Sequence, residues 1–180
     1  MERRQRTVKW PLLLGWCLVS GTHAMTHADP DEAEVKAAFV YNFAKFVEWP
    51  PETLPVADTS LSLCVLGHDP VATELLQLEG REAQGRSLHV RSLESPDEIR
   101  GCHILFVGAS EAPRFPLILQ AAGDQPVLTV ADRREFLRQG GVICLYVDGQ
   151  RVQFGVNLGA AQSRGLKLSA RLLQLARTPR

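Results

Sequence analysis

The sequence has no excess of charge of either sign, and it lacks several common binding signatures. Its 180 residues include 20 Lys and Arg and 20 Asp and Glu, so the formal net charge is zero. A nucleic-acid-binding surface usually shows as a basic excess, so we expect no nucleic-acid partner. The absence of a Cys-x-x-Cys pair or a Cys/His cluster leaves a zinc site without support. The chain also lacks G-x-G-x-x-G and P-loop spacings, so we expect no cofactor.

The apolar run near the start, WPLLLGWCLV over residues 10–19, is too short for a transmembrane helix, which needs about 20 apolar residues. It follows a basic start, MERRQRTVK, and it precedes small residues spaced as in a signal-peptidase site. We therefore expect a signal peptide over residues 1–28, cleaved after Ala24 or Ala28, rather than a membrane anchor. Residues 29–180 would then form a single domain, exported most simply to a bacterial periplasm.

Short apolar segments alternate with helix-start signals over most of the remaining chain. Buried strands are predicted for LSLCVLG (61–67), CHILFVG (102–108) and PVLTV (126–130), and RSLHVRSL alternates as a further strand. VICLYV and RVQFGV flank Asp148-Gly149-Gln150, which is typical of a hairpin. The pattern predicts an α/β fold with a mostly parallel sheet of about six strands and one antiparallel edge strand. Helices would cover both faces, as in a Rossmann-like three-layer sandwich.

Three cysteines remain once the predicted signal peptide is removed. Cys64 and Cys102 fall in the first and third predicted strands, which are neighbours in the common 2-1-3-4-5 order. Adjacent strands lie about 4.8 Å apart, within reach of a disulfide. We therefore expect a Cys64–Cys102 disulfide in an oxidising compartment, with Cys144 as a free thiol. The alternative is that Cys64 and Cys102 pack as two buried thiols.

The loops that follow the first and third strands are candidate ligand loops, because ligands of such sheets bind where strands end. They contain Gly67 and His68, and Gly108 and Ser110. The alternative is structural, with Ser110 capping a helix, Asp69 capping another and His68 exposed in its loop. A hydrolytic triad of His68, Asp69 and Ser110 lacks the G-x-S-x-G turn that would support it, so an enzyme is the weaker class.

Residues 36–50, KAAFVYNFAKFVEWP, combine five of the twelve aromatic residues with an Asn. A helix here, running to Trp49, would place most of its aromatic residues on a face packed against the sheet. Asn42 falls on that face, and we expect it to be buried with a hydrogen-bond partner. The opposite edge of the helix, with Tyr41, Lys45 and Glu48, is the candidate docking surface.

The same stretch resembles the opening helix of the YfiR-like family of exported proteins. The resemblance continues through LCVLGHDP, CHILFV, VLTVAD, GGVICLYV, FGVN and GLKLSARLLQLA, in this order. It implies a periplasmic regulator without catalytic activity, which represses an inner-membrane diguanylate cyclase by binding its periplasmic part and so lowers cyclic-di-GMP. It also implies that an OmpA-like outer-membrane lipoprotein relieves the repression by sequestering the regulator.

The resemblance implies the same disulfide, Cys64–Cys102. A second disulfide, across the last hairpin, occurs in the best-known member of the family. Here Cys144 has no cysteine nearby, because Arg151 and its neighbours are not Cys, so redox control through this hairpin is in doubt. The alternative function is a periplasmic small-molecule-binding or sensor protein, which would use the loops after Gly67 and Gly108. A homodimer stays open.

Overall fold

One mixed sheet of seven strands organises the chain, in the order β3-β4-β2-β5-β6-β7-β8. The structure is a computed structural model and describes residues 31–177. The predicted signal peptide, 1–28, lies outside the described residues. The strands are β2 (Ser60–Leu66), β3 (Glu82–Ala83), β4 (Arg86–Leu93), β5 (Ile104–Val107), β6 (Leu128–Ala131), β7 (Ile143–Asp148) and β8 (Arg151–Val156).

The five central strands are parallel and follow the predicted 2-1-3-4-5 order as β4-β2-β5-β6-β7. The predicted hairpin is confirmed, since β8 pairs antiparallel with β7. The prediction of a single antiparallel edge strand is wrong, because β3 pairs antiparallel with β4 at the other edge. β3 has only two residues, Glu82 and Ala83, too few to show the alternation that identifies a strand in a sequence.

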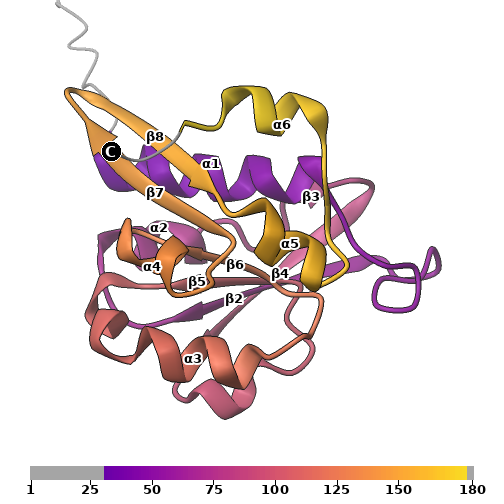
Figure 1. The fold of residues 1–180 in the computed structure, drawn as a ribbon. Helices are drawn as coiled ribbons and strands as arrows, with labels where there is room; N and C mark the ends of the chain where they lie inside the picture. The colour runs from indigo at the N-terminus through magenta and orange to yellow at the C-terminus, as the bar shows by residue number, and fades with distance from the viewer. Residues whose placement is uncertain (1–30, 178–180) are drawn as a thin grey trace, which may run out of the picture.

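Both faces of the sheet are buried, and the helices divide between them. Along β2, Leu63 and Val65 belong to one apolar cluster, while Cys64 and Leu66 belong to the other, as alternate side chains of a strand should. Figure 1 shows α1 and α6 above the sheet and α3 below it. The helices are α1 (Glu32–Phe46), α2 (Pro70–Leu76), α3 (Phe115–Ala122), α4 (Glu135–Arg138), α5 (Leu158–Ser163) and α6 (Ala170–Leu175), with short 3-10 helices η1 (Pro96–Ile99) and η2 (Ala109–Arg114).

Helix α1 ends at Phe46, three residues before the predicted end at Trp49. Val47 adopts an extended conformation, with φ −109° and ψ 135°, because a second small sheet begins there. This sheet pairs β1 (Val47–Glu48) antiparallel with β9 (Lys167–Leu168). The pairing places the end of α1 beside the segment that leads into α6.

The buried side of α1 is not centred on its aromatic residues. Its buried residues include Ala33, Ala37 and Ala44, small side chains that let the helix lie close to its neighbours. The predicted burial of Asn42 is therefore wrong, and its side chain is exposed. Phe39 and Phe46 are only partly buried, at the rim of the core.

Candidate functional site

The two predicted ligand loops meet at the carboxyl edge of the parallel strands, and their polar groups bind each other. The Asp69 carboxylate accepts hydrogen bonds from Ala72 N and Ala109 N, both at 2.7 Å. Ser110 Oγ accepts a hydrogen bond from His68 N at 3.0 Å. Asp69 thus caps α2 as predicted, whereas Ser110 ties two loops together and caps no helix. η2 has Gly108 as its N-cap, with no side-chain capping bond.

The glycines of these loops are required by close packing. A Cβ added at Gly67 would lie 2.7 Å from Ser110 Oγ, and one added at Gly108 would lie 2.8 Å from Asp69 Oδ2. Gly67 also has φ +99°, which side chains rarely adopt. The four candidate residues are therefore brought together, with His68 exposed. The cavities described below are lined by other residues, so ligand binding at these loops stays a prediction.

An ion pair beside these loops was not predicted. Lys36 Nζ donates to the two carboxylate oxygens of Asp132 at 2.7 and 2.8 Å, and also to Glu32. Burial opposes the charge on Lys36, but hydrogen bonds and charges from Asp132 and Glu32 outweigh it and raise the pKa of Lys36. Asp132 thus anchors α1 to the end of β6. The sequence contained one signal for this ion pair, because Lys36 falls on the same side of the helix as buried alanines.

The predicted docking edge is only partly assembled. The ring of Tyr41 lies between two cations, with Lys45 Nζ 3.9 Å and the Arg81 guanidinium 4.5 Å from its centroid. The Tyr41 hydroxyl donates to Glu82 O at 2.7 Å, so the side chain ties α1 to β3. Glu48 is exposed but lies in β1, beyond the end of the helix. Tyr41 and Lys45 are therefore neighbours, and Glu48 belongs to a separate element.

The two predicted cysteine states are present in the structure. Cys64 and Cys102 form a disulfide with their Cα atoms 5.8 Å apart, and Arg91 Nη2 lies 3.5 Å from each sulfur. Cys144 is free and buried, and burial raises the pKa of its thiol to about 11. Its cross-strand partner in β8 is Gly155, so this hairpin cannot carry a disulfide.

An apolar groove lies where α6 crosses α1, and we call it the α1–α6 groove. It has a volume of about 270 Å³ and is lined by Phe39, Asn42, Phe43, Phe46, Phe154, Arg171, Leu172 and Leu175. Phe43 packs edge-on against Phe154, with ring centroids 5.1 Å apart. The Arg171 guanidinium lies 5.6 Å from the Phe46 ring, and Leu175 is 59% exposed. The aromatic residues of α1 that miss the core thus line an accessible surface.

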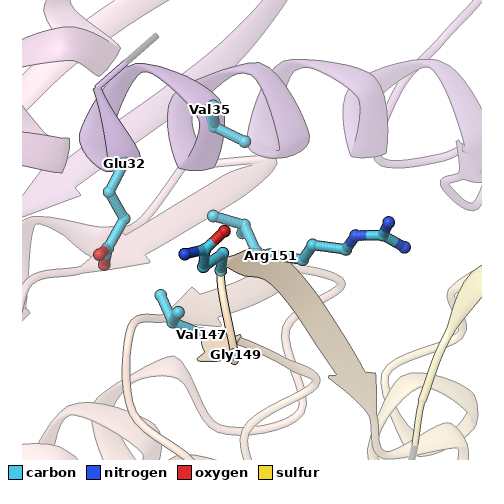
Figure 2. A pocket seen from close by; sticks show the side chains of 7 residues that line it. Glu32, Val35, Val147, Gly149 and Arg151 are labelled. Carbon is cyan, nitrogen blue, oxygen red and sulfur yellow. The ribbon is translucent and has the colours of Figure 1, made fainter. Parts of the chain in front are cut away.

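A second hollow separates the start of α1 from the tip of the β7–β8 hairpin. It measures about 710 Å³, and its lining includes Glu32, Val35, Val147, Gly149 and Arg151. Figure 2 shows Glu32 and Val35 on the helix above the hairpin, with the Arg151 side chain extending away from Glu32. Glu32 already pairs with Lys36, and Gln150 and Arg151 supply the other polar side chains of this hollow.

The family model described as YfiR/HmsC-like matches residues 33–177. The chain belongs to the YfiR/HmsC-like family. The matched range contains α1, the disulfide and both sides of the α1–α6 groove.

A solved structure of low sequence identity resembles this YfiR/HmsC-like chain in its fold alone. A conserved domain protein from Vibrio cholerae O1 biovar eltor str. N16961 gives a TM-score of 0.52 at 14% identity, covering 83% of this chain. The chain spans 60% of the length of that solved protein. An ABC domain in complex with L-Trp, from Streptococcus pneumonia, gives a TM-score of 0.48 at 11% identity over 70% of this chain and 56% of its own.

Two further findings concern the described part of this family member. Within residues 31–177, no helix has the length and apolar character needed to cross a membrane. Over the same residues, no group of three or more His, Cys, Asp or Glu side chains is arranged to hold a metal ion.

Proposed function

We propose that this YfiR/HmsC-like protein is a non-enzymatic periplasmic regulator. It represses an inner-membrane diguanylate cyclase by binding the cyclase's periplasmic part, and so lowers cyclic-di-GMP. Membership of the family over residues 33–177 supports this role. The observation that carries the docking step is the α1–α6 groove, where partly buried aromatic residues of α1 meet the exposed Leu175 of α6.

Export is part of the proposal. The basic, apolar and small-residue series of residues 1–28 supports a cleaved signal peptide. The Cys64–Cys102 disulfide supports an oxidising compartment. A single domain over residues 29–180 would then be released to the periplasm. An OmpA-like outer-membrane lipoprotein, which the family resemblance implies, would relieve repression by sequestering it.

The groove has the features that protein interfaces share. Binding energy in interfaces concentrates in a few aromatic and arginine residues near the centre of the contact. Phe39 and Phe46 supply partly exposed rings here, and Arg171 supplies a guanidinium next to one of them. We also propose that the layers form a Rossmann-like sandwich, in which α1 and α6 make up the docking layer. A second copy of the chain is a competing occupant of the same groove.

The test is to delete the gene and measure cyclic-di-GMP in the native host. We expect the concentration to rise on deletion and to fall again when the full chain is restored. A chain lacking residues 1–28 should fail to restore it, because it stays in the cytoplasm. The full chain should also bind the purified periplasmic part of the cyclase. Unchanged cyclic-di-GMP on deletion would contradict the proposed role.

A small-molecule-binding function is the second candidate. The α1–α6 groove approaches the size of ligand sites, which begin at about 300 Å³, and it combines apolar walls with the polar groups of Asn42 and Arg171. Native mass spectrometry of protein purified without denaturation would then show a retained small mass. Loss of that mass in Arg171→Leu would favour this function, and a bare protein would favour the regulator alone.

A further inference from the structure

His103 occupies a demanding position at the amino-terminal edge of the parallel strands, directly before β5. Its Nδ1 accepts a hydrogen bond from Ser62 N at 2.9 Å. A backbone N–H can only donate, so Nδ1 must carry a lone pair, and the ring is neutral with its proton on Nε2. Nε2 lies 3.4 Å from Thr53 O, the acceptor that this tautomer requires.

The contacts of His103 hold the segment 49–59, which we call the 49–59 strap. Trp49 Nε1 donates to His103 O at 3.1 Å, and the two rings stand perpendicular with centroids 6.2 Å apart. Trp49 and Leu54 are buried, whereas Val56 is 96% exposed. Outside these two side chains, the strap is held against the sheet by polar contacts, two of which come from the His103 ring and carbonyl.

The strap also supports one wall of the α1–α6 groove. It begins directly after β1, whose pairing with β9 leads the chain into α6. A Cβ added at Gly165, just before β9, would lie 3.2 Å from Pro50 Cγ of the strap. Ser169, the N-cap of α6, donates its N–H to Phe46 O at 3.0 Å. Movement of the strap would thus reach the base of α6.

We propose that His103 is an acid-operated release for the 49–59 strap. Protonation places a hydrogen on Nδ1, where it faces the N–H of Ser62, so two donors meet and the bond is lost. The imidazolium keeps its Nε2–H contact with Thr53 O, so the ring leaves β2 together with the strap, which then opens and loosens the base of α6. The link to docking rests on the proposed function of the α1–α6 groove, whereas the opening itself does not.

The electrostatic surroundings of His103 disfavour its protonated form in the closed state. Burial lowers the pKa of His103 from its ordinary value of 6.5, the Thr53 contact and Asp58 oppose that effect, and Arg86 adds to it. Among the described residues, Asp58 of the strap and Arg86 of β4 are the charged groups that act on the ring. Because the closed state has the lower pKa, closure is fully favoured above pH 6.5 and weakens as the pH falls from 6.5 to that lowered value.

Amide hydrogen exchange of the full chain between pH 7.5 and 5.0, corrected for intrinsic rates, tests the release. We expect opening of residues 49–59 to increase below pH 6.5 by up to about tenfold per pH unit, the limit for one proton. Residues 170–177 should follow with a smaller increase, and β5 should not change. None of these readings involves the cyclase, so their failure is distinguishable from failure of the proposed function.

Two matched variants make the assignment specific. His103→Asn keeps an acceptor for Ser62 N but cannot titrate, so opening should lose its pH dependence. His89→Asn, at an exposed histidine of β4, should behave as the native chain. If His103→Asn does not fold, NMR titration of the ring nitrogens in the native chain decides, with His68 as the exposed reference. The proposal is overturned if opening of residues 49–59 does not change with pH in the native chain, or if it still changes with pH in His103→Asn. It is also overturned if the His103 ring and the exposed His68 ring respond to pH in the same way.

Discussion

The carboxyl edge of the sheet and the α1–α6 groove are both places where a ligand or partner could bind, but their side chains make different contacts. At the sheet edge, the side chains of Asp69 and Ser110 accept hydrogen bonds that join the two loops. At the groove, Phe39 and Phe46 remain partly exposed around a hollow of about 270 Å³. The fold thus uses polar groups of the crevice where doubly wound sheets commonly bind ligands to join its own loops, and it leaves an apolar hollow in the helical layer above.

The difference shows how backbone proximity and side-chain size decide what a site can do. Gly67 and Gly108 let the two loops approach until no Cβ fits between them. The alanines on the buried side of α1 let that helix approach its neighbours in the same way. In the first case the approach joins the loops through Asp69 and Ser110. In the second it leaves Phe39 and Phe46 partly exposed beside the groove.

The largest expected effect separates two aromatic residues of the groove lining, one buried and one partly exposed. Phe43 is 1% exposed, and Phe43→Ala should lower the free energy of unfolding by about 3–5 kcal/mol, because it leaves a cavity in the core. Phe46→Ala removes a partly exposed ring and should cost clearly less. Denaturant unfolding of both variants measures the difference. Equal losses would mean that the groove side is ordinary core.

A pair of glycine variants tests how tightly the two loops pack at the carboxyl edge of the sheet. Gly67→Ala should destabilise by about 2 kcal/mol or more, from the left-handed backbone strain and the contact with Ser110. Gly140 has a matching φ of +100°, but a Cβ there would have no neighbour within 4 Å. Gly140→Ala therefore reports the backbone strain alone. If thermal unfolding shows the two variants equally destabilised, the loops are not tightly packed.

Tyr41 tests whether the outer edge of α1 belongs with the groove as a binding surface. Tyr41→Phe loses the hydrogen bond to Glu82 O and should cost about 1 kcal/mol. It keeps the ring between Lys45 and Arg81, so repression should stay at the native level if the edge is structural. Chemical denaturation and cellular cyclic-di-GMP measure the two effects. Raised cyclic-di-GMP in a stable Tyr41→Phe protein would extend the docking surface to this edge.

The smallest effect concerns Cys144, the free buried thiol of β7. Only the thiolate reacts with alkylating reagents, and burial raises the pKa of this thiol to about 11. Once residues 1–28 with Cys17 are removed, the folded protein should therefore resist iodoacetamide at pH 8, whereas the unfolded, unreduced protein should take up one label. Mass spectrometry distinguishes the two states. Rapid labelling of the folded chain would show that the hairpin opens readily.

Features carried by local signals could be predicted from the sequence. The cap at Asp69 is present, because it depends on a few adjacent residues. The Cys64–Cys102 disulfide also followed, since strand order fixed which strands are neighbours.

The missed features depend on contacts between distant residues. Lys36 meets Asp132 across 96 positions, and His103 meets Ser62 across 41. The position of Asn42 was mistaken because helical periodicity gives a face but not which part of it is centred on the core. The α1–α6 groove depends on the same displacement of the aromatic residues of α1 from the centre of its buried side. The groove therefore could not be predicted from the sequence.

The most direct test of the docking surface compares two exposed leucines on opposite sides of the sheet. Leu175 lies in the groove and is 59% exposed, and Leu117 lies on α3 and is 56% exposed. Leu175→Asp and Leu117→Asp would be expressed at equal periplasmic levels in cells that lack the native gene, and cyclic-di-GMP measured. We expect Leu117→Asp to restore low cyclic-di-GMP and Leu175→Asp to leave it as high as in the deletion. Full repression by a folded Leu175→Asp protein would contradict the assignment of the α1–α6 groove.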